Sequence, residues 1–180
     1  MTSFQVFLRQ KVDISALKDR YRSRGEWLGA INRLLDRGRG WLREADPDDL
    51  LEIVPYEVER VEKRLGIYDA PALKIRLGTS SVDVLPVGRY SVGLLSLDLL
   101  KGVPGNAQRW GDLFSGRVDI TNGERRHILL RSIEDGQDRW YAVGDSPSPA
   151  LLDRGRLEEI LQELQQFPAS WRSLVAVSPL

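Results

Sequence analysis

The side chains best suited to chemistry gather in the stretch 116–145, GRVDITNGERRHILLRSIEDGQDRWYAVGD. This stretch contains His127, the only histidine of the 180-residue chain, and it contains Asp119 among several arginines. Arginines around such a pair would suit a phosphate or carboxylate ligand. The same alternation of Arg and Asp is also how an antiparallel sheet faces water. The sequence leaves both interpretations open, a site and a solvated sheet surface.

The register of the first hairpin in this stretch decides which of its residues share a face. TNG is a strong turn signal, and we expect a three-residue loop with Gly123 in the left-handed conformation, followed by a bulge. That register puts four apolar residues on one face, namely Val118, Ile120, Ile128 and Leu130. The polar residues of the hairpin then lie together on the opposite face, which we predict to bind a partner. The next strand adds an aromatic residue to this face. The candidate binding residues are Arg117, Asp119, Arg125, His127, Arg131 and Trp140.

The segment GRVDI resembles the acidic strand of the PD-(D/E)xK nuclease fold, in which an Asp on one strand and an E-x-K on the next bind a divalent metal. The following strand here reads HILLRSI and lacks the E-x-K. Asp119 with Glu134 or Asp135 would form an oxygen-rich site for a hard cation. The resemblance implies a divergent metal-dependent hydrolase or nuclease, which ranks third among the functions considered.

Composition excludes several other chemistries. The chain has no cysteine, which excludes thiolate metal sites and cysteine nucleophiles, and one histidine cannot form a two-imidazole site. No G-x-S-x-G elbow, G-x-G-x-x-G loop or P-loop is present. We therefore expect no catalytic residue, no bound metal and no cofactor.

Charge is distributed unevenly, although the net charge is zero. Residues 1–43 carry ten Lys or Arg against four Asp or Glu, whereas residues 44–69 carry three against nine. Either the two segments lie against each other and neutralise, or the basic one contacts nucleic acid. The second alternative predicts phosphate contacts from Arg20, Arg24, Arg33, Arg37 and Arg39.

Hydrophobic spacing predicts helices at both ends of the chain. Apolar residues from Ile14 to Leu42 follow an a/d pattern over four heptads, which indicates one long helix or two collinear helices broken near Gly25 or Gly38. PYEVERVEKRLG, beginning at Pro55, reads as a second helix with Gly66 just after its end, so residues 1–69 are expected to form a helical hairpin. Asp153 or Ser148 would cap a C-terminal helix that ends at Pro168.

Between these helices the period changes to two. Leu73, Ile75 and Leu77 alternate with charged residues, and a four-residue GTSS loop would set Arg76 opposite Asp83. The Leu-rich segment 93–116 reads as a short buried helix or strand followed by a surface loop. The sequence predicts an α+β fold: an N-terminal helical hairpin in 1–69, then about five antiparallel strands and a C-terminal helix in 70–180.

These patterns favour a non-enzymatic protein. No apolar run approaches the roughly 20 residues that span a bilayer, and no secretory signal is recognisable, so a cytoplasmic protein without membrane contact is expected. The long apolar stripe and the five tryptophans favour an accessory subunit of a larger bacterial-type assembly, which binds a protein partner or a second copy of itself. Nucleic-acid contact through the basic helix is the alternative function.

Overall fold

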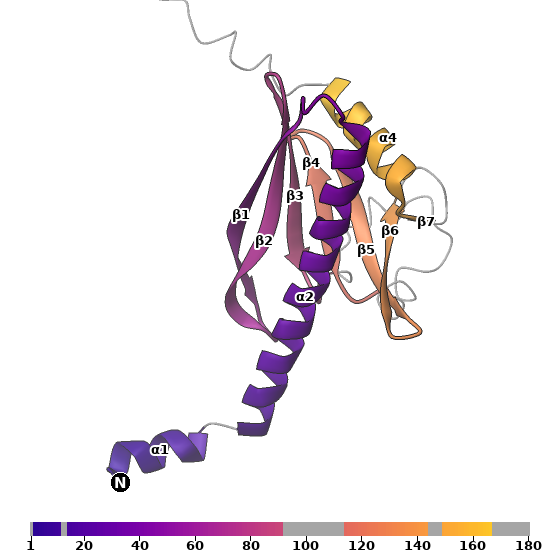
Figure 1. The fold of residues 1–180 in the computed structure, drawn as a ribbon. Helices are drawn as coiled ribbons and strands as arrows, with labels where there is room; N and C mark the ends of the chain where they lie inside the picture. The colour runs from indigo at the N-terminus through magenta and orange to yellow at the C-terminus, as the bar shows by residue number, and fades with distance from the viewer. Residues whose placement is uncertain (1, 12–13, 92–113, 144–148, 167–180) are drawn as a thin grey trace, which may run out of the picture.

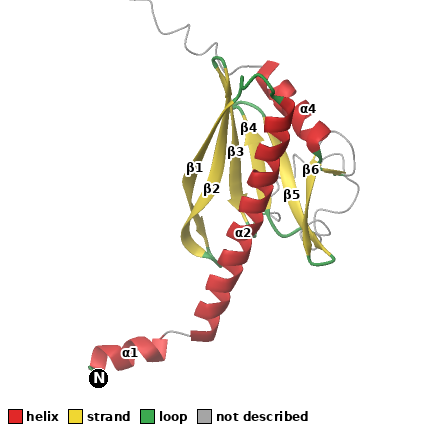
Figure 2. Cartoon of the chain, viewed as in Figure 1, coloured by secondary structure: helices red, strands yellow, loops and turns green. Residues whose placement is uncertain are grey.

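In the part of the chain that the structure describes, seven antiparallel strands form one meander sheet, with two helices on one of its faces (Figures 1 and 2). The computed structural model describes residues 2–11, 14–91, 114–143 and 149–166. The strands follow one another in chain order, each paired with its predecessor. The elements are α1 (Ser3–Lys11), α2 (Ile14–Ala45), β1 (Glu52–Glu62), β2 (Gly66–Leu77), β3 (Ser80–Gly88), β4 (Arg117–Thr121), β5 (Arg126–Glu134), β6 (Gln137–Val143), β7 (Ala150–Leu151) and α4 (Arg154–Gln166).

The predicted long helix is confirmed as α2, a single helix of 32 residues. It crosses one face of the sheet, and its N-terminal third extends beyond the sheet toward α1 (Figure 1). Neither Gly25 nor Gly38 breaks it. Gly38 lies where α2 passes α4, and a Cβ there would be 3.7 Å from Leu157 Cδ2. The buried side chains of α2 are Trp27, Ala30, Ile31, Leu34, Leu35 and Leu42.

The predicted helical hairpin is wrong, because residues 52–62 form the edge strand β1 instead of a helix. Val58 and Val61 fit a helical face, but Tyr56 and Val58 also alternate with Glu57 and Glu59, and this period of two prevails. Pro55 is tolerated because an edge strand has one row of backbone N–H groups without a strand partner. Gly66, with a φ of +79°, starts β2 after a tight turn.

The predicted hairpin of residues 73–84 is confirmed, but its register is shifted by two residues. Leu77 pairs with Ser80, so the turn has two residues and Asp83 faces Lys74 instead of Arg76. Lys74 Nζ lies 2.7 Å from Asp83 Oδ1. A shift of two leaves each side chain on its expected face, which is why the apolar pattern could not detect it.

The C-terminal helix is confirmed as α4. Asp153 caps it, because its carboxylate accepts the backbone N–H of Arg156 at 2.8 Å. Its buried face is the expected one, namely Leu157, Ile160, Leu161 and Leu164. One hydrophobic core joins this face to α2 and to strands β2 to β6. Pro168, and the Leu-rich segment up to residue 113, lie outside the described residues.

Candidate functional site

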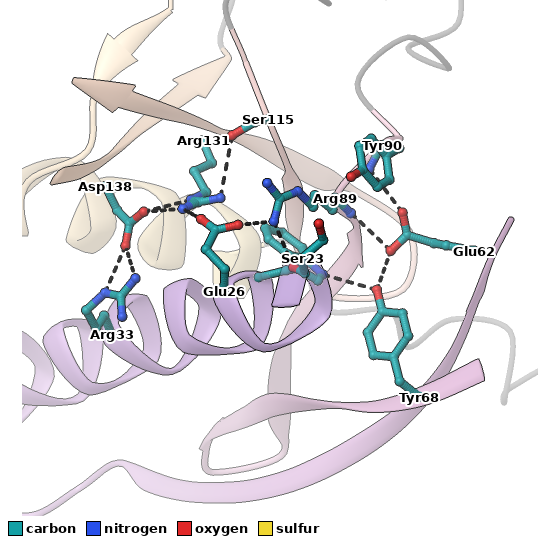
Figure 3. Close-up of polar contacts among 11 residues, drawn as sticks. Ser23, Glu26, Arg33, Glu62, Tyr68, Arg89, Tyr90, Ser115, Arg131 and Asp138 are labelled. Carbon is teal, nitrogen blue, oxygen red and sulfur yellow. Dashed lines mark hydrogen bonds and ion pairs between the residues drawn. The ribbon is translucent and has the colours of Figure 1, made fainter. Parts of the chain in front are cut away.

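A chain of alternating charges connects α2 to the sheet (Figure 3). Arg33 of α2 donates to Asp138 Oδ2 from Nε at 2.8 Å and from Nη2 at 2.5 Å. Asp138 Oδ1 accepts two hydrogen bonds from Arg131 of β5, at 2.8 and 2.5 Å. Arg131 also donates to Glu26 of α2, whose second oxygen accepts from Arg89, just after β3. Five ionised side chains thus link three parts of the sheet to one helix.

A second polar cluster continues this chain at the start of β2. The Tyr68 hydroxyl accepts a hydrogen bond from Trp27 Nε1 at 3.1 Å and donates one to Glu62. Glu62 in turn accepts the backbone N–H groups of Arg89 and Tyr90. Burial, followed by the hydrogen bond to the Glu62 carboxylate, raises the pKa of Tyr68. Tyr68 therefore stays protonated at neutral pH and can bridge the tryptophan and the carboxylate.

Arg131 is the most deeply buried charge of this network, since its side chain is only 2% exposed. A buried guanidinium is tolerated only when carboxylates pair with it and satisfy its donors. Burial alone would raise the pKa of Asp138, but hydrogen bonds from Arg131 and Arg33 outweigh that effect and hold the pKa below its usual value. Asp138 is therefore ionised at neutral pH, and the network docks α2 onto the sheet.

The predicted partner-binding face does not exist as one surface, because the β4–β5 register differs from the expected one. Thr121 pairs with Arg126 around a four-residue turn, not a three-residue loop, although Gly123 does have a positive φ of +93°. Val118 therefore faces Leu129, and Ile120 faces His127. The Asn122 carboxamide stabilises this turn by accepting the backbone N–H groups of Glu124 and Arg125.

This register divides the six candidates between the two sheet faces and the turn. His127, Arg131 and Trp140 lie on the face covered by the helices. Arg117 and Asp119 lie on the opposite face, together with the buried Ile128 and Leu130. Arg125 lies in the turn. The alternating pattern predicts the wrong register because three consecutive residues, Ile128, Leu129 and Leu130, are all buried. Strand β5 therefore has apolar residues on both faces of the sheet, and alternation cannot identify the core face.

Asp119 and His127 each contact a different side chain and do not pair with each other. Arg117 donates to both carboxylate oxygens of Asp119, at 2.7 and 2.8 Å, and both side chains are buried. His127 Nε2 lies 3.1 Å from Glu163 Oε2 of α4. Because Asp119 and His127 occupy opposite faces, the two cannot share a proton directly. Asp119 thus belongs to a buried ion pair with Arg117, and His127 contacts a carboxylate of α4.

The five arginines singled out on α2 are spread around the helix. Arg24 donates to the backbone carbonyl of Ile67 at 3.1 Å, and Arg39 pairs with Asp36 one turn away. Arg20 packs near the β1–β2 turn, where its Cδ would lie 3.9 Å from a Cβ added to Gly66. Three of these arginines thus have local roles. Arg33 belongs to the ion chain described above, and it lies in the same cleft as Arg37.

Arg33 and Arg37 meet Trp140 in a cleft between α2 and the β5–β6 turn. The cleft has a volume of about 460 Å³, within the range of small-molecule sites. It combines two guanidiniums with amide and apolar groups; the lining residues are Arg33, Leu34, Arg37, Gly136, Gln137, Asp138 and Trp140. The fold therefore brings three predicted site residues together in one place.

Sequence reasoning missed the carboxylates of the network. Glu26 immediately precedes the fully buried Trp27 in α2. Its position next to the apolar stripe is the one feature of the sequence that indicates a carboxylate close to the core. Asp138 follows the Asp135-Gly136 turn and reads as part of it. Each bonds Arg131, but Glu26 is 105 residues away from it, a separation at which local patterns give no information.

The described residues contain neither a cluster of metal ligands nor a membrane-spanning helix. Within that part of the chain, no three His, Asp or Glu side chains gather closely enough to hold a metal ion. No helix among the described residues is long and apolar enough to cross a membrane.

Comparisons with protein-family models, curated proteins and solved structures find no match for this chain.

Proposed function

We propose that the protein is a non-enzymatic interaction protein, an accessory subunit of a larger assembly, that binds its partner through an N-terminal arm. The arm consists of α1 and residues 14–22 of α2, which extend past the end of the sheet (Figure 1). The observation that carries the proposal is its exposed apolar surface: Phe4 is 63% and Phe7 49% exposed, and their rings stack 6.2 Å apart. Exposed aromatic residues of this kind are typical anchors in protein interfaces.

The arm has the pattern of a helix that binds in a groove. Phe4, Phe7 and Leu8 have the i, i+3, i+4 spacing of one helical face, and all three are exposed. On α2, Ile14 and Tyr21 are also exposed. Farther along α2 the sheet and α4 cover the apolar stripe, but nothing in the described part of the chain covers this portion to the same extent.

Charge favours another protein over a second arm as the partner. Residues 3–22 carry five Lys or Arg against two Asp, a net charge of +3. Two such arms would repel each other, whereas an apolar groove with an acidic rim would complement both features. The arm therefore fits a partner protein with that kind of groove.

The test compares an arm variant with a matched control. Phe4→Ser/Phe7→Ser removes the anchor, and Val61→Ser removes an apolar side chain that is 71% exposed on β1, outside the arm. A partner isolated with the full chain and then purified should bind the arm variant at least tenfold more weakly, a loss of about 1.4 kcal/mol. Its affinity for Val61→Ser should match that of the unchanged chain.

Two results would overturn the proposal. One is a purified partner that binds both variants and the unchanged chain equally, because the arm would then contribute nothing. The other is a chain whose only association is with itself, seen as a concentration-dependent mass in sedimentation equilibrium that the arm variant retains.

A further inference from the structure

We propose that the cleft between α2 and the β5–β6 turn binds the phosphate group of a small phosphomonoester. This site is separate from the arm, and neither proposal depends on the other. The argument rests on the surplus of positive charge at the cleft, on the fixed position of Arg33, and on the size of the cavity.

The ion chain beneath the cleft places one of its arginines, Arg33, at the cleft surface. It contains three arginines and two carboxylates, so a cation stands at each end. At the Arg89 end, the carboxylate of Glu62 accepts the backbone N–H of Arg89 and lies close by. At the opposite end, Arg33 reaches the surface with a side chain that is 60% exposed.

Arg37 adds a second positive charge to the same cleft. It is exposed and lies one helical turn after Arg33, so the two side chains share a face of α2. Among the described residues, Asp138 is the one carboxylate that lines the cleft, and the buried Arg131 also bonds it from below. The lining therefore presents two guanidiniums to a single carboxylate whose charge is already shared, which suits a dianion better than a monoanion.

Arg33 is held in place before any ligand binds. Two of its nitrogens bond Asp138, and its third lies over Gly29, where a Cβ would be 3.2 Å from Nη1. A guanidinium fixed in this way loses little conformational freedom on binding, which favours phosphate recognition. Arg37 supplies the more mobile second contact, and Gln137 adds a side-chain amide at the rim.

The cavity is larger than a phosphate group alone requires. About 460 Å³ accommodates a small organic molecule attached to the phosphate, and Leu34 and Trp140 provide apolar contact for it. A phosphodiester carries one negative charge and a phosphomonoester close to two at neutral pH. The charge of the cleft therefore favours the monoester over a nucleic-acid backbone.

The experiment titrates the full chain with inorganic phosphate, a hexose phosphate, acetate and a single-stranded oligonucleotide, at one ionic strength maintained with chloride. Backbone amide shifts of Gly136 and Gln137 in NMR spectra report on the cleft. The hexose phosphate should bind more tightly than inorganic phosphate, and acetate at least tenfold more weakly than either.

Arg37→Gln is the decisive variant, because it leaves the ion chain intact. It should weaken phosphate binding at least tenfold without changing the thermal midpoint of the free protein. Arg43→Gln is the matched control, since Arg43 is exposed on α2 but does not line the cleft. Equal phosphate binding by Arg37→Gln and the unchanged chain would refute the proposal. Tighter binding of the oligonucleotide than of either phosphate compound would also refute it, by making the site a nucleic-acid contact.

Discussion

Replacing Asp138 by asparagine tests whether the ion chain stabilises the fold. The substitution preserves size but leaves the buried Arg131 and the exposed Arg33 facing a neutral amide. Removing one partner of a buried ion pair costs about 3–5 kcal/mol. We expect the lower end, about 3 kcal/mol, because Arg131 keeps Glu26 and Arg33 can return to water. For a chain of this size that loss lowers the melting temperature by roughly 6–12 °C.

The loss of unfolding free energy is measured by urea unfolding, monitored by circular dichroism and by tryptophan fluorescence. Glu52→Gln is the control, because its ion pair with Arg76 is exposed on both sides and should contribute less than about 1 kcal/mol. The pKa of Asp138 is depressed in the folded protein, so its contribution is complete above the unfolded pKa, about 3.9, and is lost as the pH falls toward the folded pKa. When the pH is lowered from 5 to 2, the unfolding free energy of Asp138→Asn should therefore fall by less than that of the unchanged chain. A neutral-pH loss no larger than that of Glu52→Gln would refute the reasoning.

Three further substitutions test the packing of α2, all by urea unfolding. Gly38→Ala should stabilise by about 0.5–1 kcal/mol, because alanine favours the helix and its Cβ would meet Leu157 at an ordinary contact distance of 3.7 Å. Gly116→Ala should destabilise by roughly 2 kcal/mol or more, since its φ is +154° and a Cβ there would overlap the Trp27 ring. Trp27→Phe should cost about 2 kcal/mol, because it deletes a fully buried hydrogen-bond donor to Tyr68 and leaves a cavity.

The two helices that cover the sheet could be predicted because their signals are local. In α4, a capping aspartate and four apolar residues at helical spacing specify both the start and the buried face. In α2, the apolar stripe outweighs the glycines within it, since burial against the sheet offsets the helix propensity lost at each one.

Strand β1 could not be predicted from its pattern in this way, because an edge strand is only partly buried. In Glu52–Glu62 no residue is fully buried, so the period-two signal is weak. Val58, Val61 and Leu65 then mimic a helical face, although Val61 is 71% exposed and Leu65 is fully buried beyond the strand. What decides the outcome is pairing with β2, which continues over the whole strand.

The residues of the cleft could be predicted individually but not as a site. Residue type alone marks Arg33, Arg37 and Trp140 as candidates, but the sequence pattern predicts Trp140 on a different surface from the two arginines. Only the docking of α2 onto the sheet brings them together, and the ion pair between Arg33 and Asp138 spans that contact. Long-range ion pairs carry no periodic signal, so a sequence pattern cannot reveal them.

The ion chain also explains how one position of α2 is selected on an apolar sheet. A helix with a repeating apolar stripe can shift by one turn, about 5.4 Å, and still bury leucines. Such a shift would remove Glu26 from Arg131 and bring either Ala30 or Arg22 opposite it. The first leaves a buried guanidinium with one carboxylate fewer, and the second adds a like charge; both are strongly unfavourable at a side chain that is 2% exposed. Apolar contacts therefore hold α2 on the sheet, and the buried charges determine where along the sheet it lies.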